Sequence, residues 1–359
     1  MRKLIKGYPA LLAILLTVFF TGSCREIYNH DAGHMENVII VEGLITDRNE
    51  PYVIKLNTKT LIDNNLHDQT SFPTGISDAT VYVKDNNDEI FFFTESEPGN
   101  YYSQEFFRGI SGNTYTLFIE TPDGHSYVSE PQSLPFPVNI DSLYARPKVK
   151  ETLKRNAQGG YFLKSTEGAE VLLDISYQDE QYKHFRLVPE GLILYNFPTG
   201  EIQNYLWKKI NMLEHVNVSS YKFETTSIVT RQHNVTFFPH SKYEYNINND
   251  EYIHRKILLL KIYGLNKDSW DFYTAIERQI NSEGKLFDPV ATRLPSNIRC
   301  TSDASRLALG LFEASSVVSV TYILVERPWE DSYHLKKTDD LDHLPPNGNQ
   351  PYLPDFWVN

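Results

Sequence analysis

The stretch Ala79-Thr-Val-Tyr-Val-Lys-Asp-Asn-Asn-Asp-Glu-Ile-Phe-Phe-Phe-Thr94 carries the pattern on which the predicted fold depends. Ala79, Val81 and Val83 alternate with Thr80 and Tyr82, which gives a strand one apolar face and one face toward solvent. The Asp-Asn-Asn-Asp run that follows tolerates the backbone dihedrals of tight turns, and a second apolar run comes directly after it. The stretch therefore predicts a β-hairpin.

Strand signals of the same kind continue on both sides of this hairpin. The predicted strands are Val38–Thr46, Tyr52–Asn57, Ala79–Lys84, Ile90–Thr94, Tyr101–Phe106, Thr114–Glu120 and Ser126–Ser129. About seven short strands in roughly 100 residues predict an immunoglobulin-like or transthyretin-like β-sandwich. The prolines at 135 and 137 favour an extended connector, so the sandwich domain is predicted to cover 37–137.

The remainder of the chain predicts a larger β-rich domain over 138–327. Its predicted strands are Glu170–Tyr177, His184–Val188, Ile193–Tyr195, Tyr221–Val229, Asn234–Phe238, His254–Tyr263 and Ala308–Tyr322. One main helix is predicted near 266–283, because Asn266 can cap it, Trp270 and Tyr273 begin an apolar stripe, and Gly284 can end it. The proline-rich segment 328–359 is predicted to be an irregular tail.

The N-terminus has the order of a bacterial lipoprotein signal peptide. Three basic residues lie among the first eight, Ala10–Phe20 is apolar, and Thr-Gly-Ser precedes Cys24. The apolar run is too short for a bilayer core that needs roughly 20 residues. We expect cleavage after residue 23, acylation of Cys24 and a tether over 24–36, although an uncleaved anchor helix or an ordinary secreted protein remains an alternative.

The charge and cysteine content exclude several classes of function. The chain has 34 basic and 46 acidic residues, and loss of the predicted signal peptide removes three of the basic ones. An acidic surface repels phosphate backbones, so we expect no nucleic-acid partner. If Cys24 is acylated, Cys300 is the remaining thiol, which we interpret as a small apolar residue rather than a reactive nucleophile.

Motifs for catalysis or cofactor binding do not emerge from the sequence. Gly-x-Ser-x-Gly, His-Glu-x-x-His and phosphate-binding glycine loops are missing from it. The weaker candidates are Ser219 with Lys222; His30, Asp31 and His34; the acidic run Asp85–Glu89; Asp250-Glu251 and Asp339-Asp340; and His215, His233, His240 and His254. We interpret the carboxylates as solvated and predict a non-enzymatic protein with no catalytic, cofactor or metal site.

Aromatic residues provide the remaining candidate chemistry. Neighbouring residues of a strand point to opposite faces, so Phe91-Phe-Phe93 and Tyr101-Tyr102 must each place at least one ring outward. Outward rings can stack on sugars or anchor a protein interface. Cross-strand pairing on a solvated face is the alternative.

The order of several motifs resembles a family of Bacteroidota lipoproteins known as domain of unknown function 4249. The matching stretches are Val38–Thr46, Asp78–Val81, Gly99–Tyr102, Gly112–Leu117, Asp123–Tyr127, Ile140–Leu143, Asp271–Tyr273, Leu286–Pro289, Pro295–Ile298, Leu309–Phe312 and Pro354–Trp357. The resemblance implies an outer-membrane lipoprotein, on the cell surface or the periplasmic face, that is an accessory or binding subunit of a TonB-dependent nutrient-uptake receptor. Its ligand would be a nutrient or a glycan.

Two further expectations complete the functional prediction. Asp141-Ser142-Leu143 is similar to the acceptor motif for O-glycosylation of exported Bacteroidota proteins, which makes Ser142 a candidate modification site. The alternative function is a surface adhesin or glycan-binding module without a transport partner.

Overall fold

The computed structural model describes residues 38–61, 71–176, 184–199, 202–211, 217–220, 223–224, 227–239, 256–280, 294–327, 332–338, 341 and 343–350. Asn37–Asn359 forms one compact unit. The predicted signal peptide, the lipidation residue Cys24 and the tether lie outside the described residues. Among the helical residues that are described, none forms a stretch with the length and apolarity needed to cross a membrane.

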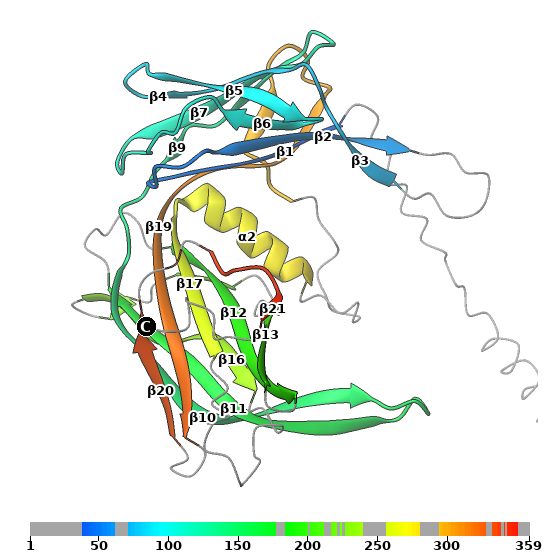
Figure 1. The fold of residues 1–359 in the computed structure, drawn as a ribbon. Helices are drawn as coiled ribbons and strands as arrows, with labels where there is room; N and C mark the ends of the chain where they lie inside the picture. Colours follow the sequence, from blue (N-terminus) through cyan, green and yellow to red (C-terminus); the bar gives the residue numbers. More distant parts are fainter. Residues whose placement is uncertain are drawn as a thin grey trace, which may run out of the picture. The chain divides into compact units, whose positions relative to one another are not determined.

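The described chain is mainly β, as predicted, and its first region is a layered arrangement of short strands (Figure 1). These strands are β1 (Val38–Thr46), β2 (Val53–Leu61), β3 (Ser71–Gly75), β4 (Thr80–Asp85), β5 (Ile90–Glu97), β6 (Asn100–Ser103), β7 (Thr114–Glu120), β8 (Ser126–Ser129), β9 (Gln132–Ser133) and β18 (Ile298–Cys300). A ladder of antiparallel pairs runs β1–β2–β6–β5–β4–β7–β8–β18. The predicted β4–β5 hairpin is confirmed.

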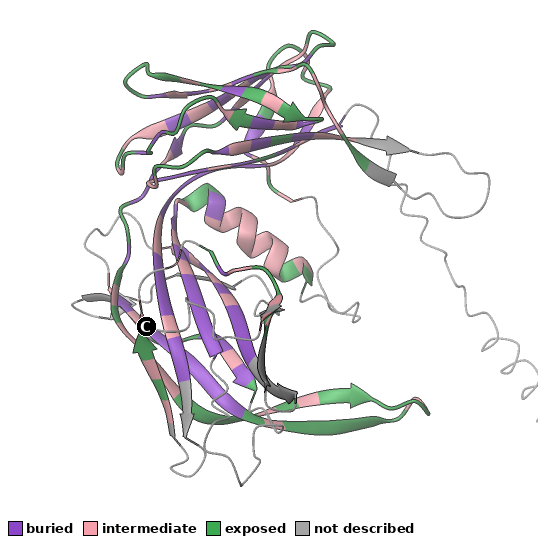
Figure 2. Ribbon diagram, viewed as in Figure 1, coloured by how far each residue is buried: buried purple, intermediate pink, exposed green. Residues whose placement is uncertain are grey.

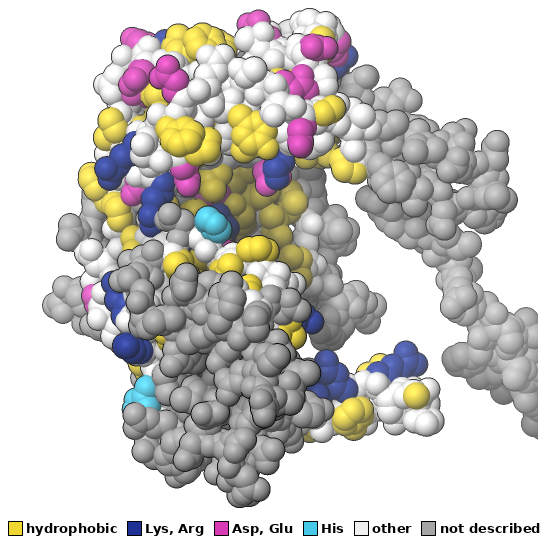
Figure 3. Space-filling model, viewed as in Figure 1, with side chains coloured by type: hydrophobic (Ala, Val, Ile, Leu, Met, Phe, Trp, Pro, Cys, Tyr) yellow, Lys and Arg dark blue, Asp and Glu magenta, His cyan; other side chains and the backbone are white. Residues whose placement is uncertain are grey.

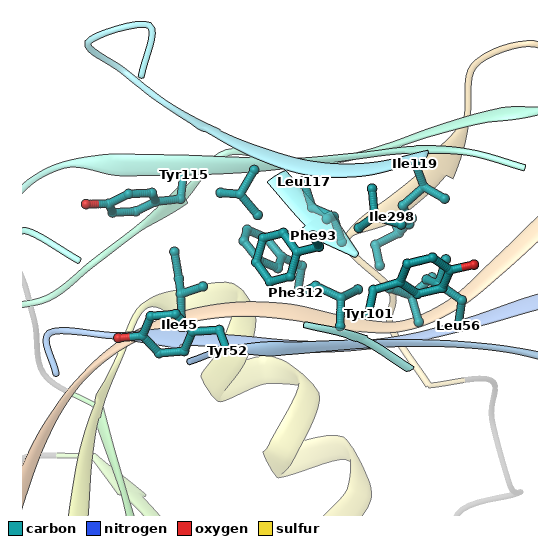
Figure 4. Close-up of a cluster of buried hydrophobic side chains, with 14 of the residues drawn as sticks. Ile45, Tyr52, Leu56, Phe93, Tyr101, Tyr115, Leu117, Ile119, Ile298 and Phe312 are labelled. Atoms are coloured by element: carbon teal, nitrogen blue, oxygen red, sulfur yellow. The ribbon is translucent and has the colours of Figure 1, made fainter. Parts of the chain in front are cut away.

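Two layers of this region face each other across an apolar core. Figure 4 shows Tyr115 and Leu117 of β7 on one side, and Ile45 of β1 and Phe312 on the other. Figure 2 shows how buried and exposed positions alternate along these strands. Val81 and Val83 are buried, as the alternation in β4 predicts. Each aliphatic or phenyl side chain that is buried in this way contributes about 1.5–3 kcal/mol.

One long strand, β19 (Leu307–Arg327), belongs to both regions of the molecule. Its first half pairs in parallel with β1, up to Thr46↔Ser315. Its second half pairs antiparallel with β17 (Lys256–Leu265), from Ser316↔Gly264 onward. Where β1 ends, the Asp47 side chain accepts a hydrogen bond from the Val317 N–H at 2.8 Å and takes the place of the next strand residue.

The first region therefore contains strands from outside the predicted range 37–137, namely β18 and half of β19. The sequence could not indicate this pairing, because the partner of β1 lies near the other end of the chain. The domain boundary near Pro137 stays a prediction.

The second region contains two sheets and a helix. The strands are β10 (Asn139–Arg155), β11 (Tyr161–Ser176), β12 (His184–Thr199), β13 (Ile202–Asn211), β14 (Asn217–Ser220), β15 (Phe223–Glu224), β16 (Ser227–Pro239), β17, β20 (Ser332–Lys337) and β21 (Gly348–Gln350). One sheet runs β20–β19–β17–β12–β13–β21, with β14 also pairing with β12, and the other runs β10–β11–β16–β15. Phe185, Phe238 and Leu260 lie in the core that β11, β12, β16, β17 and β19 share.

Three local expectations for this region were wrong. The predicted strand Tyr221–Val229 is divided between β15 and β16, which pair antiparallel. The tail 328–359 is not irregular throughout, because β20 pairs with β19 and β21 pairs with β13. The predicted strands 184–188 and 193–195 form the single strand β12. Pro189 interrupts the sequence pattern, but the strand continues through it, because β12 pairs with β17 on both sides of Pro189, which lies opposite Leu260.

Helix α2 (Lys267–Ile280) confirms the predicted helix near 266–283. The Asn266 Oδ1 accepts a hydrogen bond from the Ser269 N–H at 2.9 Å, which is the cap that the sequence predicts. Gly284, the predicted end, lies outside the described residues. Ser269 is the buried residue of the helix, whereas Ile280 at its end is exposed.

Candidate functional site

A buried ionic cluster joins the helix to three strands. We call Arg186, Tyr263, Tyr273, Glu313 and Ser315 the Arg186 cluster. Arg186 on β12 lies opposite Tyr263 on β17 in the strand register. Glu313 and Ser315 follow each other on one face of β19, and Tyr273 comes from α2. The cluster thus brings together residues from the elements that meet where β19 passes from one region to the other.

The Arg186 guanidinium is held between two aromatic rings. Its central carbon lies 4.5 Å from the ring centroid of Tyr263 and 4.3 Å from that of Tyr273. Its Nη2 lies 3.5 Å from Glu313 Oε1, and the Glu313 side chain is 3% exposed. Cation–π contacts of this kind contribute about 2 kcal/mol when they are desolvated. The arrangement fixes the cation from three sides.

Both oxygens of the Glu313 carboxylate are occupied. The Tyr273 hydroxyl donates to Oε2 at 2.6 Å, and the Ser315 hydroxyl donates to Oε1 at 2.6 Å. The buried Arg186 Nε has no hydrogen-bond partner among the described residues. Such an unpaired donor costs about 1–3 kcal/mol or more, so the cluster is not an optimal stabilising unit.

The charge of Arg186 and the protons of Tyr263 and Tyr273 are held in place over the ordinary pH range. Burial opposes the charge of Arg186, but the Glu313 carboxylate together with Tyr273 and Tyr263 outweighs burial, so the pKa of Arg186 is raised. Burial and then the Glu313 charge raise the pKa of Tyr273, and burial likewise raises that of Tyr263. A tyrosine whose proton is held this firmly is a poor general base. The cluster is therefore suited to fixing α2 against β12, β17 and β19.

An open pocket lies beside the first turn of α2. It has a volume of about 180 Å³, and its lining residues are Glu130, Asp268, Asp271, Phe272, Pro295, Ser296, Asn297 and Leu311. Figure 3 shows that the molecule is hollowed on this face at the level of α2, with hydrophobic side chains inside and charges of both signs around the edge. Three carboxylates beside a phenyl ring suit a cationic or hydroxyl-rich ligand rather than an anion.

Hydrogen bonds fix two walls of this pocket. The Asn297 side chain donates to the Phe312 carbonyl at 2.7 Å and accepts from the Phe312 N–H at 3.0 Å. Gln132 Nε2 donates to Asp268 Oδ2 at 3.2 Å, and Asn266 Nδ2 donates to Gln132 Oε1 at 2.8 Å. The pocket is therefore preformed by the cap of α2 and by β19.

The aromatic residues singled out from the sequence divide between the two faces as expected. Phe93 is 5% exposed and Phe92 is 50% exposed, while Tyr101 is buried and Tyr102 is exposed. The ring of Phe92 lies 5.9 Å from that of Tyr82, its cross-strand partner on β4. Outward Phe92 is therefore part of a cross-strand pair on a solvated face. It does not line the pocket beside α2.

The acidic run Asp85–Glu89 forms the turn of the β4–β5 hairpin. Asp85 Oδ1 accepts from the N–H groups of Asn87 and Glu89 at 2.8 and 2.9 Å. Lys84 Nζ lies 2.5 Å from Asp88 Oδ1. Asp88 is exposed, as expected for a solvated hairpin, but Asp85 is buried, because its carboxylate accepts hydrogen bonds from the backbone of the turn.

Cys300 and Ser142 occupy ordinary positions in strands. Cys300 is partly buried against the first core, and its Sγ lies 3.4 Å from Ser302 Oγ. Ser142 lies on β10, where its hydroxyl donates to Asp174 Oδ2 at 3.0 Å. O-glycosylation of Ser142 stays a prediction.

The remaining candidates are largely outside the described part of the chain. That holds for the side chains of His30, Asp31, His34, His215, Ser219, Lys222, His240, Asp250, Glu251, His254, Asp339 and Asp340. Of the four candidate histidines His215, His233, His240 and His254, the side chain of His233 is described, and its ring lies 5.3 Å from that of Phe185. Burial lowers the pKa of His233. Within the described ranges, no three histidine, cysteine or acidic side chains gather as a metal site.

Sequence reasoning missed both the Arg186 cluster and the pocket. Arg186 and Glu313 are far apart in the sequence, and each lies in a strand with no motif around it. The one available signal was a charged residue within an otherwise apolar strand, since Glu313 follows Leu311 and Phe312 in the predicted strand Ala308–Tyr322. A charge in such a position is rarely buried unless it is paired.

The comparisons with known proteins agree with the family resemblance seen in the sequence. The model of the domain of unknown function DUF4249 matches residues 25–321. Among curated proteins and among solved structures, none matches the chain. Since the matched segment covers most of the chain, the protein belongs to the DUF4249 family.

Proposed function

We propose that this protein is a non-enzymatic lipoprotein of the outer membrane that serves as an accessory or binding subunit of a TonB-dependent nutrient-uptake receptor. The observation that carries the proposal is that the family match begins at residue 25, directly after the predicted lipidation residue Cys24. The family match thus includes the predicted tether and begins next to the predicted anchor. Anchoring by several acyl chains is far firmer than by one.

The chemistry of the described residues supports binding rather than catalysis. In the Arg186 cluster the carboxylate, the guanidinium and the Tyr273 hydroxyl are engaged with one another, and the pKa of Tyr273 is raised. A catalytic acid or base needs a pKa near the working pH and access to substrate. The pocket beside α2 offers carboxylates, a phenyl ring and the Ser296 hydroxyl, and its lining contains no histidine or lysine beside that hydroxyl.

The pocket also supports a second candidate function, a glycan-binding module without a transport partner. Asp268, Asp271 and Asn297 provide hydrogen-bonding groups, and Phe272 provides a ring on which a sugar can stack. The same pocket could bind the nutrient that a receptor imports. The two proposals therefore differ in the partner and agree on the pocket.

Anchoring is tested first, with the two cysteines as a matched pair. Cys24→Ala should release the protein from the membrane fraction of its native cells after a high-salt wash, because the acyl chains have no attachment point and salt screens the attraction of exposed charges. Cys300→Ala is the control and should leave the protein in the membrane, since Cys300 packs against the first core. Equal membrane association of wild type and both variants would contradict the lipoprotein assignment.

The accessory role is tested by asking whether a receptor copurifies with the protein. The tagged protein, crosslinked in its native cells and extracted with mild detergent, should copurify with a TonB-dependent β-barrel identified by mass spectrometry. Repeated recovery of the anchored protein without a barrel would reject the accessory role. In that case, binding to purified glycans would favour the glycan-binding module. Phe272→Ala should abolish this binding, and Phe92→Ala should leave it unchanged.

A further inference from the structure

The β10–β11 hairpin extends beyond the sheet to which it belongs. In that sheet β11 pairs with β16 from Gly168↔Pro239 onward, and β10 pairs with β11 along its whole length. We call residues 149–167, which precede this point, the arm. Within the arm the two strands pair with each other and with no other described strand (Figure 1).

The end of the arm is an ordered turn. Asn156 Oδ1 accepts from the N–H groups of Gln158 and Gly160 at 3.1 and 2.7 Å. The Asn156 N–H donates to the Gly160 carbonyl at 2.8 Å, and Gly159 has a φ of 84°, which favours glycine. The arm is thus a defined two-stranded ribbon, exposed along its length (Figure 2).

Large apolar side chains on both faces of the arm lie in solvent. The exposed fractions are 56% for Val149, 61% for Leu153, 69% for Tyr161, 48% for Phe162 and 62% for Leu163. The register places Leu153 opposite Leu163 on one face and Lys154 opposite Phe162 on the other. An isolated ribbon with exposed strand edges and apolar side chains is an aggregation hazard unless a partner covers it.

The charge of the arm is opposite in sign to that of the chain, since the arm has four basic residues against two acidic ones, Glu151 and Glu167, which lie near its base. Residues 152–166, which we call the tip, contain Lys154, Arg155 and Lys164 and no aspartate or glutamate, whereas the whole chain has a net charge of −12. A partner that covers the tip must therefore be anionic and must accept apolar side chains on both faces of a ribbon. An anionic phospholipid surface does both, since its phosphates attract basic residues and its interface accepts aromatic and aliphatic groups.

The dimensions of the tip fit the bilayer interface. Leu153 and Leu163 each lie three residues from the ends of the Asn156–Gly160 turn, which places them about 10 Å from it at roughly 3.3 Å per residue. Apolar groups of interfacial proteins enter about 5–10 Å into the boundary between headgroups and acyl chains. A folded protein would instead need a socket that encloses both faces of the ribbon.

We propose that the tip of the β10–β11 arm inserts into the interface of an anionic phospholipid bilayer, with Leu153, Tyr161, Phe162 and Leu163 among the headgroups and Lys154, Arg155 and Lys164 at the phosphates. This contact goes beyond the proposed function, because it needs neither acylation nor a receptor. It would hold the arm against the membrane and so restrict the orientation of an anchored domain.

The test uses the mature chain with Cys24→Ser, which removes the acylation site and leaves the arm as the proposed membrane contact. Cosedimentation should show binding to phosphatidylcholine vesicles that contain phosphatidylglycerol, and little to vesicles of phosphatidylcholine alone. Raising the salt concentration should weaken this binding, since screening reduces the attraction of exposed charges.

Two paired substitutions separate the charge from the apolar contribution. Lys154→Gln with Lys164→Gln should weaken binding roughly thirty-fold, at about five-fold for each basic residue near an anionic surface. Leu153→Ser with Leu163→Ser retains the charges and should weaken binding at least about tenfold. Lys208→Gln with Lys209→Gln, and Phe92→Ser, alter exposed residues outside the arm and are the controls.

The side chains changed in the arm are exposed, so the thermal unfolding midpoint of each variant should match that of the parent. Absence of binding to phosphatidylglycerol vesicles at low salt would overturn the proposal. Binding that both arm variants retain would also overturn it. An arm-dependent crosslink to a protein, without vesicle binding, would replace the bilayer by an acidic protein partner. None of these outcomes depends on whether the receptor copurifies.

Discussion

Glu313 and Glu170 are both buried carboxylates paired with cations, but the cations differ in their access to water. The partner of Glu313 is Arg186, whose side chain is 16% exposed. The partners of Glu170 are Arg146 and Lys148, whose side chains are 51% and 45% exposed. When the carboxylate is lost, Arg146 and Lys148 can turn to solvent, whereas Arg186 stays buried between two rings. The comparison teaches that the burial of the partner decides what such a pair contributes.

Glu170 and its partners Arg146 and Lys148 lie in the part of the β10–β11 hairpin that belongs to the sheet with β16. Arg146 Nε and Nη2 each lie 2.9 Å from Glu170 Oε2, and Asn234 Nδ2 donates to Oε1 at 2.6 Å. Lys148 Nζ contacts the same Oε1. Burial opposes the ionisation of Glu170, but the hydrogen bonds from Lys148, Arg146 and Asn234 outweigh it and lower the pKa of this carboxyl.

The largest effect is expected from Glu313→Gln. The amide retains an acceptor for Ser315 but removes the charge that balances the buried guanidinium of Arg186. Breaking a buried pair in this way costs about 3–5 kcal/mol. Urea unfolding of the purified mature chain should report this loss in the free energy of unfolding.

The paired variant Arg186→Met with Glu313→Leu is the control for that prediction. It removes both charges, so it should be more stable than Glu313→Gln alone, because replacing a buried pair by apolar residues is often neutral or stabilising. A Glu313→Gln protein as stable as wild type would break the comparison, since it would mean that Arg186 finds water or another acceptor.

A smaller loss, about 1.5–3 kcal/mol, is expected from Glu170→Gln, because the charged acceptor is removed while Arg146 and Lys148 become hydrated. The pH dependence sharpens the difference. Since the folded pKa of Glu170 is lowered, its stabilisation is complete above the unfolded value near 4.5 and is lost as the pH falls through the folded pKa. The decline of stability below this pH should therefore be shallower in Glu170→Gln than in wild type.

Asp47 extends the comparison to a carboxylate that accepts a backbone hydrogen bond. Burial raises the pKa of Asp47, and the hydrogen bond from the Val317 N–H offsets part of that effect. The folded state therefore binds the proton more tightly than the unfolded state, and the contribution of Asp47 to stability falls as the pH rises from 3.8 through the folded pKa. Asp47→Asn retains the acceptor oxygen and should remove this decline.

The measurement is the difference in unfolding free energy between Asp47→Asn and wild type across that pH range. The unfolding free energy of Asp47→Asn should increase relative to that of wild type as the pH rises. A relative loss instead would show that the ionised carboxylate is the better acceptor for Val317 and that burial does not dominate.

Local patterns were sufficient to predict much of the fold. The predicted strands Val38–Thr46, Thr114–Glu120 and Ser126–Ser129 have the bounds of β1, β7 and β8. β7 and β8 alternate between buried and less buried positions, and β1 is an apolar run that is buried over most of its length. Asn266 identified the start of α2 because its cap is a contact between near neighbours in the chain.

The sequence did not predict the arm or the Arg186 cluster, for two different physical reasons. The arm has solvent on both faces, so it lacks the period of two that a half-buried strand shows. The pairing of Glu313 with Arg186 depends on β19 passing from β1 to β17, which is a property of the tertiary fold. A pattern within either strand contains no information about its partner.

The smallest effect is expected from Lys148→Ala, which removes one of the two exposed cations at Glu170. Arg146 and Asn234 still donate to the carboxylate, so Glu170 is left neither uncharged nor unpaired. Exposed partners of this kind contribute about 0–1 kcal/mol. The change in unfolding free energy should thus be well below that of Glu170→Gln and should shrink further at high salt, because Lys148 is screened where it reaches water. A loss as large as that of Glu170→Gln would mean that Lys148 carries the pair by itself, and that the exposure of a cation does not limit its contribution.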